Sequence, residues 1–495
     1  MSESSERRFI PELNRIFYFF LSGLFCISMT YSCENKSSSS LILGSKIELF
    51  VDSFLIESLD NVQFRMHLPE DKGTVLWFDK PWEGPFSTYS TIIKDNNIYR
   101  LYYRGLPSTR GEGTNEEVTC YAESTDGIQW IKPDLKIFRI MGSFSNNVVL
   151  ANASPASTNF SPFLDNSSSK PVNGKFKALG GTNNGLIAFS SDDGVHWNKI
   201  REKPVLTGEY FDSQNVSFWS GNEMCYLCYF RKWIQNDGKL IRSIGRSTSL
   251  DFINWTKPVA MEFGNTVAEE LYTNQTSPYY RAPHIYIAIA ARFFPGKQVV
   301  SNDQAQRLKV NPDFYHDCSD AVLMTSRGGN HYQRTFMEGF LRPGIGLGNW
   351  VSRTNYPALN VVQTGETEMS FYVNQEYAQP TSHLQRYSLR IDGFTSLDAG
   401  YKQGEMITKL LTFTGSHLVI NFSTSAAGFL LVELIDSNGN VVQGYSSGSC
   451  IPIIGNEISR QVEWKSGSDL TKFINTPVRL RFILKDADLY SICFE

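Results

Sequence analysis

The 495-residue sequence is poor in charged residues and carries little net charge. Asp, Glu, Lys and Arg make up 19% of the chain, against about 25% in an average soluble protein, and the formal net charge is −4. This balance argues against a nucleic-acid-binding protein, which needs a basic surface. The low net charge, combined with 41% hydrophobic residues, also argues against a disordered chain.

The chain also lacks a cysteine framework and the common catalytic motifs. Six of its eight cysteines are scattered between Cys120 and Cys493, which is not the spacing of a disulfide-rich domain. Cys225 and Cys228 lie in a strand-like segment without a second such pair or a nearby His pair, so we expect buried thiols rather than a zinc site. No P-loop or HExxH motif occurs.

The N-terminus has the pattern of an export signal. Arg7, Arg8 and Arg15 precede an apolar run over residues 16–29, which is short for a membrane span. A small residue then precedes Cys33, as in bacterial lipoprotein signals, and residues 34–46 begin with a polar, serine-rich stretch. We predict a lipoprotein-type signal peptide over 1–33, lipid attachment at Cys33, a polar tether over 34–46, and a location in the cell envelope, in the periplasm or outer membrane. An ordinary cleaved signal and an uncleaved anchor are the alternatives.

Aromatic residues are abundant, at 13% of the chain, and four of them close a repeated signature. A strand-like run is followed by a Ser- or Thr-rich turn with Asp or Gly, and then by an aromatic residue. The four aromatic residues are Trp130, Trp197, Trp255 and Tyr332. Aspartate accepts hydrogen bonds from turn amides and glycine supplies a positive φ, so each signature predicts a β-hairpin.

The spacing of these hairpins predicts a β-propeller. The closing aromatic residues lie roughly 60 to 80 residues apart, as expected for four-stranded blades with long loops. Residues 368–394 contain a fifth strand-turn-aromatic unit. We therefore predict an all-β protein with a five-bladed propeller, the catalytic domain, over 47–397. Short alternating strands after Gly400 predict a small β-sandwich over 400–495.

Candidate catalytic residues are sought at the starts of the innermost strands, because these converge on the propeller axis. The segments that we expect there hold Glu83, Asp212 and Glu368. Glycoside hydrolysis needs two carboxyl groups, one protonated and one ionised, on either side of the scissile bond. Each of the three carboxylates also has a structural alternative: capping a turn, bonding turn amides or pairing with an arginine.

Arginine and aromatic side chains near the expected strands form a second group of candidates. A guanidinium group binds a carboxylate or a sulfate with two hydrogen bonds, so several arginines in one pocket favour an acidic sugar. Aromatic rings stack on sugar faces. The predicted substrate-binding residues are Trp82, Arg104, Arg231, Tyr272, Arg281, Arg353 and Tyr356. Arg327, Tyr279 and Tyr280 belong to the same group.

We predict no metal site and no cofactor. The segment 316–320, His-Asp-Cys-Ser-Asp, favours hydrogen bonding within a loop, with Ca²⁺ bound by Asp317 and Asp320 as the alternative.

Several segments resemble a widespread group of secreted bacterial proteins related to glycoside hydrolases. These segments are 50–57, 211–216, 272–275 with Asn274, 281–286, 354–357 and 423–428. The group is similar, more distantly, to five-bladed propeller hydrolases of the arabinanase, xylosidase and invertase type. The resemblance implies three acids, here Glu83 or Asp52, Asp212 and Glu368, and a substrate-binding role for Asn274. The short Asn-Asp-Pro and Arg-Asp-Pro motifs of those hydrolases are absent.

The sequence thus predicts an exported enzyme that hydrolyses oligosaccharides from an acidic plant or algal polysaccharide, uronate-containing or sulfated. Glu368 is the expected general acid, and Asp212 or Glu83 the base or nucleophile. A lyase or dehydratase using His284, Tyr280 and Arg281 is one alternative. A non-catalytic glycan-binding lipoprotein is the other. The expected partner is an acidic glycan, with no nucleic acid, and with membrane contact only through the lipid.

Overall fold

A computed structural model of the chain describes residues 40–167 and 174–495. The predicted signal peptide, Cys33 and the start of the predicted tether lie outside this part. Regular structure in the described residues is almost entirely β, and the predicted fold class is confirmed. Helical segments are short: α1 (Asn302–Leu308), η1 (Thr109–Gly111), η2 (Pro312–Phe314) and η3 (Thr471–Phe473). In the described part no helix is long and apolar enough to cross a membrane.

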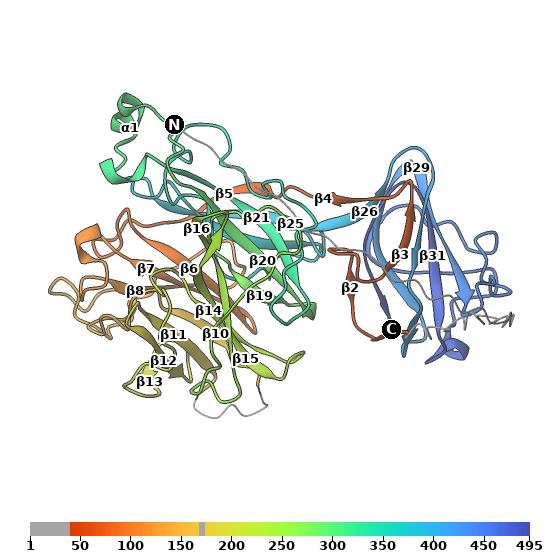
Figure 1. Cartoon of the computed structure of the whole chain (residues 1–495), viewed down its shortest axis with the longest axis horizontal. Helices are drawn as coiled ribbons and strands as arrows, with labels where there is room; N and C mark the ends of the chain where they lie inside the picture. The colour runs from red at the N-terminus through yellow and green to blue at the C-terminus, as the bar shows by residue number, and fades with distance from the viewer. Residues whose placement is uncertain (1–39, 168–173) are drawn as a thin grey trace, which may run out of the picture. The chain divides into compact units, whose positions relative to one another are not determined.

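Five separate antiparallel sheets form the blades of the propeller (Figure 1). Blade 1 contains β6 (Thr88–Asp95), β7 (Ile98–Gly105), β8 (Val118–Ser124) and β9 (Val148–Leu150). Blade 2 contains β10 (Ser161–Leu164), β11 (Phe176–Thr182), β12 (Gly185–Ser191) and β13 (Asn198–Lys199). Blade 3 contains β14 (Val216–Ser220), β15 (Cys225–Asn236), β16 (Lys239–Ser249) and β17 (Val259–Ala260). Blade 4 contains β18 (Leu271–Thr273), β19 (Thr276–Tyr279), β20 (Ala282–Phe294) and β21 (Cys318–Ser326).

Blade 5 closes the ring with a strand from the start of the chain. It contains β22 (Tyr356–Pro357), β23 (Val362–Gln363), β24 (Glu368–Gln375) and β25 (His383–Arg390). Its outer strand is β5 (Glu70–Trp77), which pairs antiparallel with β25 (Figure 1). This pairing covers an edge that would otherwise expose unpaired backbone groups, and it joins the two ends of the propeller.

The predicted turn signature closes the third strand of the blades. In blade 2, Asp193 Oδ1 accepts hydrogen bonds from the backbone N–H groups two and three residues further on, both at 2.8 Å. The Trp197 Nε1–H donates to the Gly194 carbonyl at 3.2 Å, which holds the ring under the turn. Asp126 and Asp251 accept the same backbone bonds in blades 1 and 3. Local chemistry therefore makes the blade repeat visible in the sequence.

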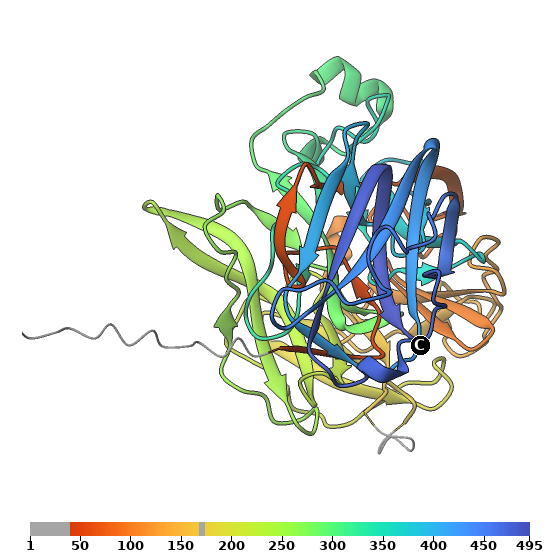
Figure 2. The ribbon, with the colours of Figure 1, turned by 90° about the vertical axis from the view of Figure 1, so that its right-hand side faces the viewer.

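The sandwich combines strands from both ends of the described chain. Its N-terminal strands are β1 (Leu41–Gly44), β2 (Glu48–Leu49), β3 (Ile56–Asp60) and β4 (Gln63–Met66). Its C-terminal strands are β26 (Thr395–Ala399), β27 (Gly404–Thr408), β28 (Leu411–Phe413), β29 (Leu418–Asp436), β30 (Asn456–Gln461) and β31 (Val478–Phe494). Figures 1 and 2 show the red N-terminal strands among the blue C-terminal ones.

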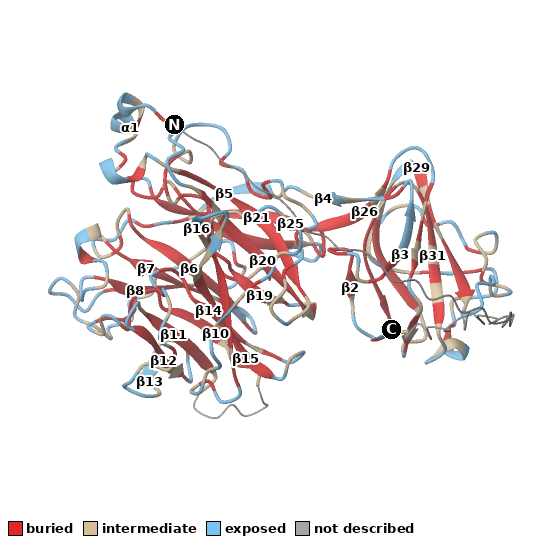
Figure 3. Ribbon diagram, in the orientation of Figure 1, coloured by how far each residue is buried: buried red, intermediate tan, exposed pale blue. Residues whose placement is uncertain are grey.

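This composition differs from the predicted boundaries. Strand β1 pairs with β28, β3 with β27, and β4 with β26, so residues 41–66 belong to the sandwich and not to a tether or to the first blade. The physical reason is a shared core: Leu43, Phe50 and Leu55 pack with Leu480 and Phe482. Figure 3 shows the strands of both parts as mainly buried and their connecting loops as mainly exposed.

Candidate functional site

The innermost strands of the five blades run in the same direction around the axis, so they all begin at one end of the channel. We call this end the mouth. It consists of residues 86–91, 158–161, 211–216, 271–276 and 353–357. Five non-glycine residues here have a φ of 51° to 60°: Tyr89, Asn159, Gln275, Arg353 and Asn355. Such strained backbone clusters at functional sites, and it marks the mouth as the candidate site.

Two glutamine side chains fix the mouth segments to one another. The Gln214 Nε2 group donates to the Ser90 carbonyl at 3.2 Å and to Thr91 Oγ1 at 3.0 Å. The Gln275 Nε2 group donates to Gln214 Oε1 at 2.7 Å and to the Pro357 carbonyl at 2.5 Å. These buried bonds connect blades 1, 3, 4 and 5 at the axis, so the mouth is a rigid frame for the side chains above it.

Three arginine side chains surround the Tyr272 ring. The guanidinium carbons of Arg231 and Arg242 lie 4.8 and 4.7 Å from the ring centroid, and that of Arg353 lies at 5.6 Å. These distances are those of cation–π contacts. Arg242 also pairs with Glu270, with 3.3 Å between Nη1 and Oε2. The mouth therefore concentrates positive charge from blade 3 and from the segment that leads into blade 5.

A fourth arginine reaches the mouth from blade 1. The Arg104 guanidinium carbon lies 4.8 Å from the centroid of the Tyr89 ring. Burial, together with Tyr272, raises the pKa of Tyr89 well above its usual value, although Arg104 and Arg353 act to lower it. Tyr89 therefore stays protonated at neutral pH and is not a base.

Two half-exposed carboxylates at the mouth are each held by a buried arginine. The Asp212 side chain is 47% exposed, and its Oδ1 lies 2.5 Å from Nη1 of Arg231, whose side chain is 4% exposed. The Glu112 side chain is 42% exposed, and its Oε1 lies 3.1 Å from Nη1 of Arg104. Both carboxylates are therefore oriented by a fixed cation while they remain open to a ligand.

Arg353 has no such partner. It pairs with no carboxylate in residues 40–167 and 174–495, and its guanidinium carbon lies 5.0 Å from the Phe314 ring centroid. Burial acts to lower the pKa of Arg353, but Tyr272 and other nearby tyrosines raise it above its usual value. This permanent cation between two aromatic rings has the chemistry to hold an anionic group.

A third carboxyl group lies beneath the mouth. Glu117 is fully buried; its Oε2 accepts the Gly113 N–H at 2.9 Å and the Thr158 hydroxyl at 3.3 Å, and its Oε1 has no partner in the described residues. Burial raises the pKa of Glu117, against the opposing effect of Arg104. Glu117 is thus a carboxyl group that takes up a proton more readily than a free glutamate does, next to the positive cluster.

Seven of the predicted site residues meet at the mouth: Asp212, Arg104, Arg231, Tyr272, Asn274, Arg353 and Tyr356. Five of them are buried, and Asn274 and Tyr356 are the most deeply buried of these. Asn274 is 2% exposed and its Oδ1 accepts the Thr276 N–H at 3.0 Å. Tyr356 is 2% exposed and packs against Tyr272. These two side chains support the site from below.

Glu83 and Trp82 do not face the mouth. Glu83 has no exposed surface; its Oε2 lies 2.6 Å from Lys132 Nζ, and its Oε1 accepts the Tyr103 hydroxyl at 2.5 Å. The Trp82 Nε1–H donates to Asn147 Oδ1 at 2.9 Å. The Glu83 carboxylate also accepts the Lys80 N–H at 3.0 Å, so it caps a turn. It has no route to a substrate in this structure.

Glu368 lies at the opposite end of the channel from the mouth. It is the first residue of β24, the second strand of its blade, and second strands run antiparallel to the innermost ones. Its Oε1 lies 2.7 Å from Nη1 of Arg386. Although burial acts to raise the pKa of Glu368, the hydrogen bond from Arg386 lowers it overall. A general acid needs the opposite shift.

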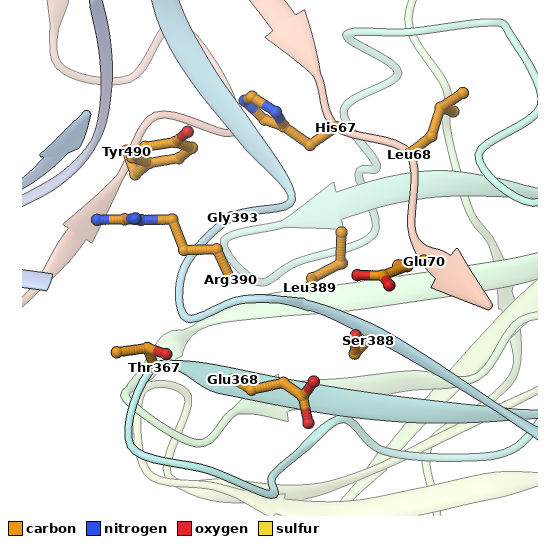
Figure 4. A pocket seen from close by; sticks show the side chains of 10 residues that line it. All are labelled: His67, Leu68, Glu70, Thr367, Glu368, Ser388, Leu389, Arg390, Gly393 and Tyr490. Atoms are coloured by element: carbon orange, nitrogen blue, oxygen red, sulfur yellow. The ribbon is translucent and has the colours of Figure 1, made fainter. Parts of the chain in front are cut away.

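Glu368 instead lines a pocket of about 370 Å³ beside the sandwich (Figure 4). Its most prominent cation is Arg390, whose guanidinium carbon lies 4.7 Å from the Tyr490 ring centroid. Arg390 already donates to Asn421 Oδ1 at 2.8 Å and to the Phe422 carbonyl at 3.0 Å. Arg390 is therefore used to join blade 5 to the sandwich, and Glu368 is paired within blade 5, so we do not place the functional site there.

His284 and Arg281 also lie at the junction with the sandwich. His284 Nε2 is 2.8 Å from Glu48 Oε1, and Arg281 Nη1 is 2.6 Å from Asp392 Oδ2. Asp52, the alternative first acid, pairs with Arg327 at 2.8 Å. His284 lies at the start of β20 and Tyr280 and Arg281 directly precede it; β20 is again a second strand, so all three are at the end opposite the mouth. The residues needed for the proton-abstraction alternative are therefore remote from the mouth.

The segment 316–320 makes loop hydrogen bonds. Asp317 Oδ1 accepts the Gly296 N–H at 2.7 Å, and Asp320 binds Arg292 through both oxygens at 2.8 and 2.6 Å. Within residues 40–167 and 174–495, no group of three or more His, Cys, Asp or Glu side chains is arranged to hold a metal ion.

Sequence reasoning missed Tyr89, Glu112, Glu117 and Arg242 at the mouth. Tyr89 follows Ser87-Thr88 at the start of a short inner strand, and no alternating pattern marks it. Glu112 and Glu117 belong to the β7–β8 loop, whose acidic composition was the only available signal.

Comparisons with known proteins found likeness in fold. No protein-family model matches the chain, and no characterised protein matches it by sequence. A solved structure described as a glycoside hydrolase aligns at 10% identity over 65% of this chain and 92% of the other, with a TM-score of 0.43. An N-acetylgalactosamine deacetylase from F. plautii aligns at 11% identity over 67% and 96%, with a TM-score of 0.43.

A third similar structure is the catalytic domain of the GH62 α-L-arabinofuranosidase of Coprinopsis cinerea. It aligns at 9% identity over 65% of this chain and 97% of the other, with a TM-score of 0.38. The five blades described above, rather than these alignments, establish the propeller fold.

Proposed function

We propose that this protein hydrolyses glycosidic bonds in oligosaccharides that carry acidic groups, and that the mouth of the propeller binds them. The observation that carries the proposal is the Arg353 guanidinium, which lies between the Tyr272 and Phe314 rings without a carboxylate partner in the described residues. A uronate carboxylate or a sulfate ester supplies the missing anion. Its planar or trigonal oxygens match the guanidinium donors.

The reaction needs two carboxyl groups, and the mouth offers Asp212 and Glu112. Each is half-exposed and is oriented by an arginine, from blade 3 and blade 1 respectively. Asp212 is proposed as the base or nucleophile, because Arg231 orients its half-exposed carboxylate. Glu112 is proposed as the second carboxyl group of the reaction, because Arg104 orients it in the same way.

The test is hydrolysis of a panel of oligosaccharides with uronate residues, with sulfate esters, and with neither group. Release of new reducing ends from an acidic member supports the proposal. Arg353→Ala is expected to raise KM for that substrate about tenfold or more, because it removes a charge-assisted bond, and to leave a neutral analogue unaffected. Equal activity on acidic and neutral members would reject the role of Arg353.

Glycan binding without cleavage is the second candidate. It is favoured by the observation that Asp212 and Glu112 are both paired with arginine, which gives each carboxylate a structural role that needs no catalysis. Tight binding of an acidic oligosaccharide with no reducing ends released after long incubation would support this candidate over hydrolysis.

Export and lipid attachment at Cys33 form a separate proposal, supported by the basic and apolar pattern of residues 7–29. Wild-type protein is expected in the membrane fraction, and Cys33→Ala protein in the soluble fraction. Unchanged membrane partitioning of Cys33→Ala would reject it.

A further inference from the structure

A cavity of about 540 Å³ lies on blade 4, one strand outward from the mouth. It is lined by the end of β20, the start of β21 and the loop that contains Trp350. Strand β20 ends, and β21 begins, at the mouth end of the blade, because Leu271 at the start of β18 pairs with Arg292 near the end of β20. The cavity and the mouth therefore open at the same end of the propeller.

Two contacts connect the cavity directly to the mouth. Ser319 lines the cavity, and its hydroxyl donates to the Thr354 carbonyl, next to Arg353, at 2.6 Å. Glu269 and Glu270 are neighbours in the chain: Glu269 binds Arg292 in the cavity wall at 2.6 Å, whereas Glu270 binds Arg242 at the mouth. The two regions thus share their walls.

The cavity wall contains an aromatic ring that is suited to a sugar. Trp350 is half-buried, and its Nε1–H donates to the Gly344 carbonyl at 3.2 Å, which fixes the orientation of the indole. Gly344 has a φ of 81°, a conformation that other residues rarely adopt. The Trp350 ring forms no aromatic pair or cation–π contact with another residue of the described part. An oriented indole of this kind stacks on the apolar face of a pyranose.

The rim of the cavity carries two cations without a carboxylate partner in the described residues, one of which, Lys297, lies 4.8 Å from the centroid of the Phe294 ring. Lys297 and Arg342 line the cavity and form no ion pair with residues 40–167 or 174–495. Arg292, in contrast, is bound by Asp320 at 2.6 Å and by Glu269, so it is not available to a ligand. A wall with one aromatic platform and a few free polar groups is the usual composition of a ligand site of this size.

We propose that this cavity is a second subsite, which binds the acidic sugar residue adjacent to the one held by Arg353. Trp350 stacks on the ring of this residue, Lys297 and Arg342 bind its carboxylate or sulfate, and the exposed carboxylate of Glu338 accepts its hydroxyl groups. This inference rests on the proposed function, because it needs an acidic oligosaccharide at the mouth. It adds that the protein distinguishes oligosaccharides by their length as well as by their charge.

The test compares the affinities of galacturonic acid and tetragalacturonic acid, and of sulfated galactose and a sulfated galactan tetrasaccharide, by titration calorimetry. For one of the two chemistries, wild-type protein is expected to bind the tetramer at least tenfold more tightly than the monomer. Trp350→Ala is expected to abolish this difference, Trp350→Phe to keep most of it, and Arg353→Ala to weaken both ligands by a similar factor. Trp77→Ala, which removes a half-exposed tryptophan on blade 5, is the matched control and is expected to change neither affinity.

The outcomes separate the two proposals. If neither the monomers nor the tetramers bind to wild-type protein, the proposed function fails and the subsite fails with it. The subsite is rejected if the wild-type protein binds the monomer and the tetramer with equal affinity. It is also rejected if the Trp350→Ala variant melts at the wild-type temperature and still prefers the tetramer. In either case the acid-binding mouth stands. If Trp350→Ala is unfolded, full loss of the preference in a folded Lys297→Ala/Arg342→Ala variant supports the subsite, and full retention rejects it.

Discussion

Replacing Asp212 by Asn separates catalysis from stability at the mouth. The carboxylate is the only charged partner of Arg231 within the described residues, at 2.5 Å, and the Nε and Nη2 atoms of that guanidinium are buried without partners. Breaking a fully buried ion pair costs about 3–5 kcal/mol, whereas an exposed pair contributes about 0–1 kcal/mol. Asp212 is 47% exposed, and Asn keeps a carbonyl oxygen as acceptor. We therefore expect a loss of about 1 kcal/mol.

A loss of that size lowers the melting temperature by no more than about 4 °C. A base or nucleophile, in contrast, contributes about 10²- to 10⁴-fold to the rate. The assay is kcat/KM on the oligosaccharide identified in the panel, alongside a thermal melt of each variant. Glu368→Gln is the control, since its ion pair with Arg386 is at the other end of the channel, and it is expected to keep full activity. Asp212→Asn protein that melts normally and keeps more than half of the activity would refute the catalytic assignment.

Three further outcomes follow from buried or hydrogen-bonded carboxylates. Asp392→Ala is expected to lower the free energy of unfolding by about 3–5 kcal/mol in denaturant titrations, because it leaves Arg281 at the propeller–sandwich junction unpaired. A change below about 1 kcal/mol would contradict a stabilising role for the Arg281–Asp392 ion pair. Burial raises the pKa of Glu117 in the folded state. The contribution of this group to stability therefore falls as the pH rises above the usual pKa of a glutamate. The melting temperature of Glu117→Gln should increase relative to that of the wild type between pH 4 and 7. A constant difference across that range would count against the shift. Burial acts to raise the pKa of Asp251, but backbone hydrogen bonds lower it to about 2. The stability that this carboxylate contributes above pH 4 should therefore be lost between about pH 4 and 2. The loss of stability over this pH range should be smaller in Asp251→Asn than in the wild type.

The blade count was predictable because the signal is local. Each hairpin needs an acceptor such as Asp193 for turn amides and an aromatic residue such as Trp197 beneath them, so the same chemistry recurs in the sequence wherever a blade ends. The two halves of the sandwich were not predictable in the same way. Strands β1 to β4 are short, and their partners lie more than 300 residues away in the chain, so no local pattern connects them.

Only part of the candidate site was predictable, because the inner strands of two blades are also short. Asp212 and Arg353 were expected near the starts of inner strands and do lie at the mouth, because each precedes a strand in a polar segment. Glu368 and His284 were not, because the long apolar strands β24 and β20 look like the inner strands of a blade. The true inner strands of blades 4 and 5 have two to four residues each and leave almost no pattern. Confusing a first strand with a second one moves a residue to the opposite end of the channel.

The charge balance of the mouth shows how a nearly neutral chain could select an acidic ligand, as the proposed function requires. Arg104, Arg231 and Arg242 are each neutralised by a carboxylate that the fold supplies, so they orient those carboxylates rather than attract anions. Arg353 alone is left uncompensated among the arginines at the mouth in the described part of the chain, and its strained backbone, with a φ of 56°, is held in place by the packing around it. Selectivity then depends on one cation in a low-dielectric setting, where a single charge acts strongly, and the total charge of −4 carries no information about it.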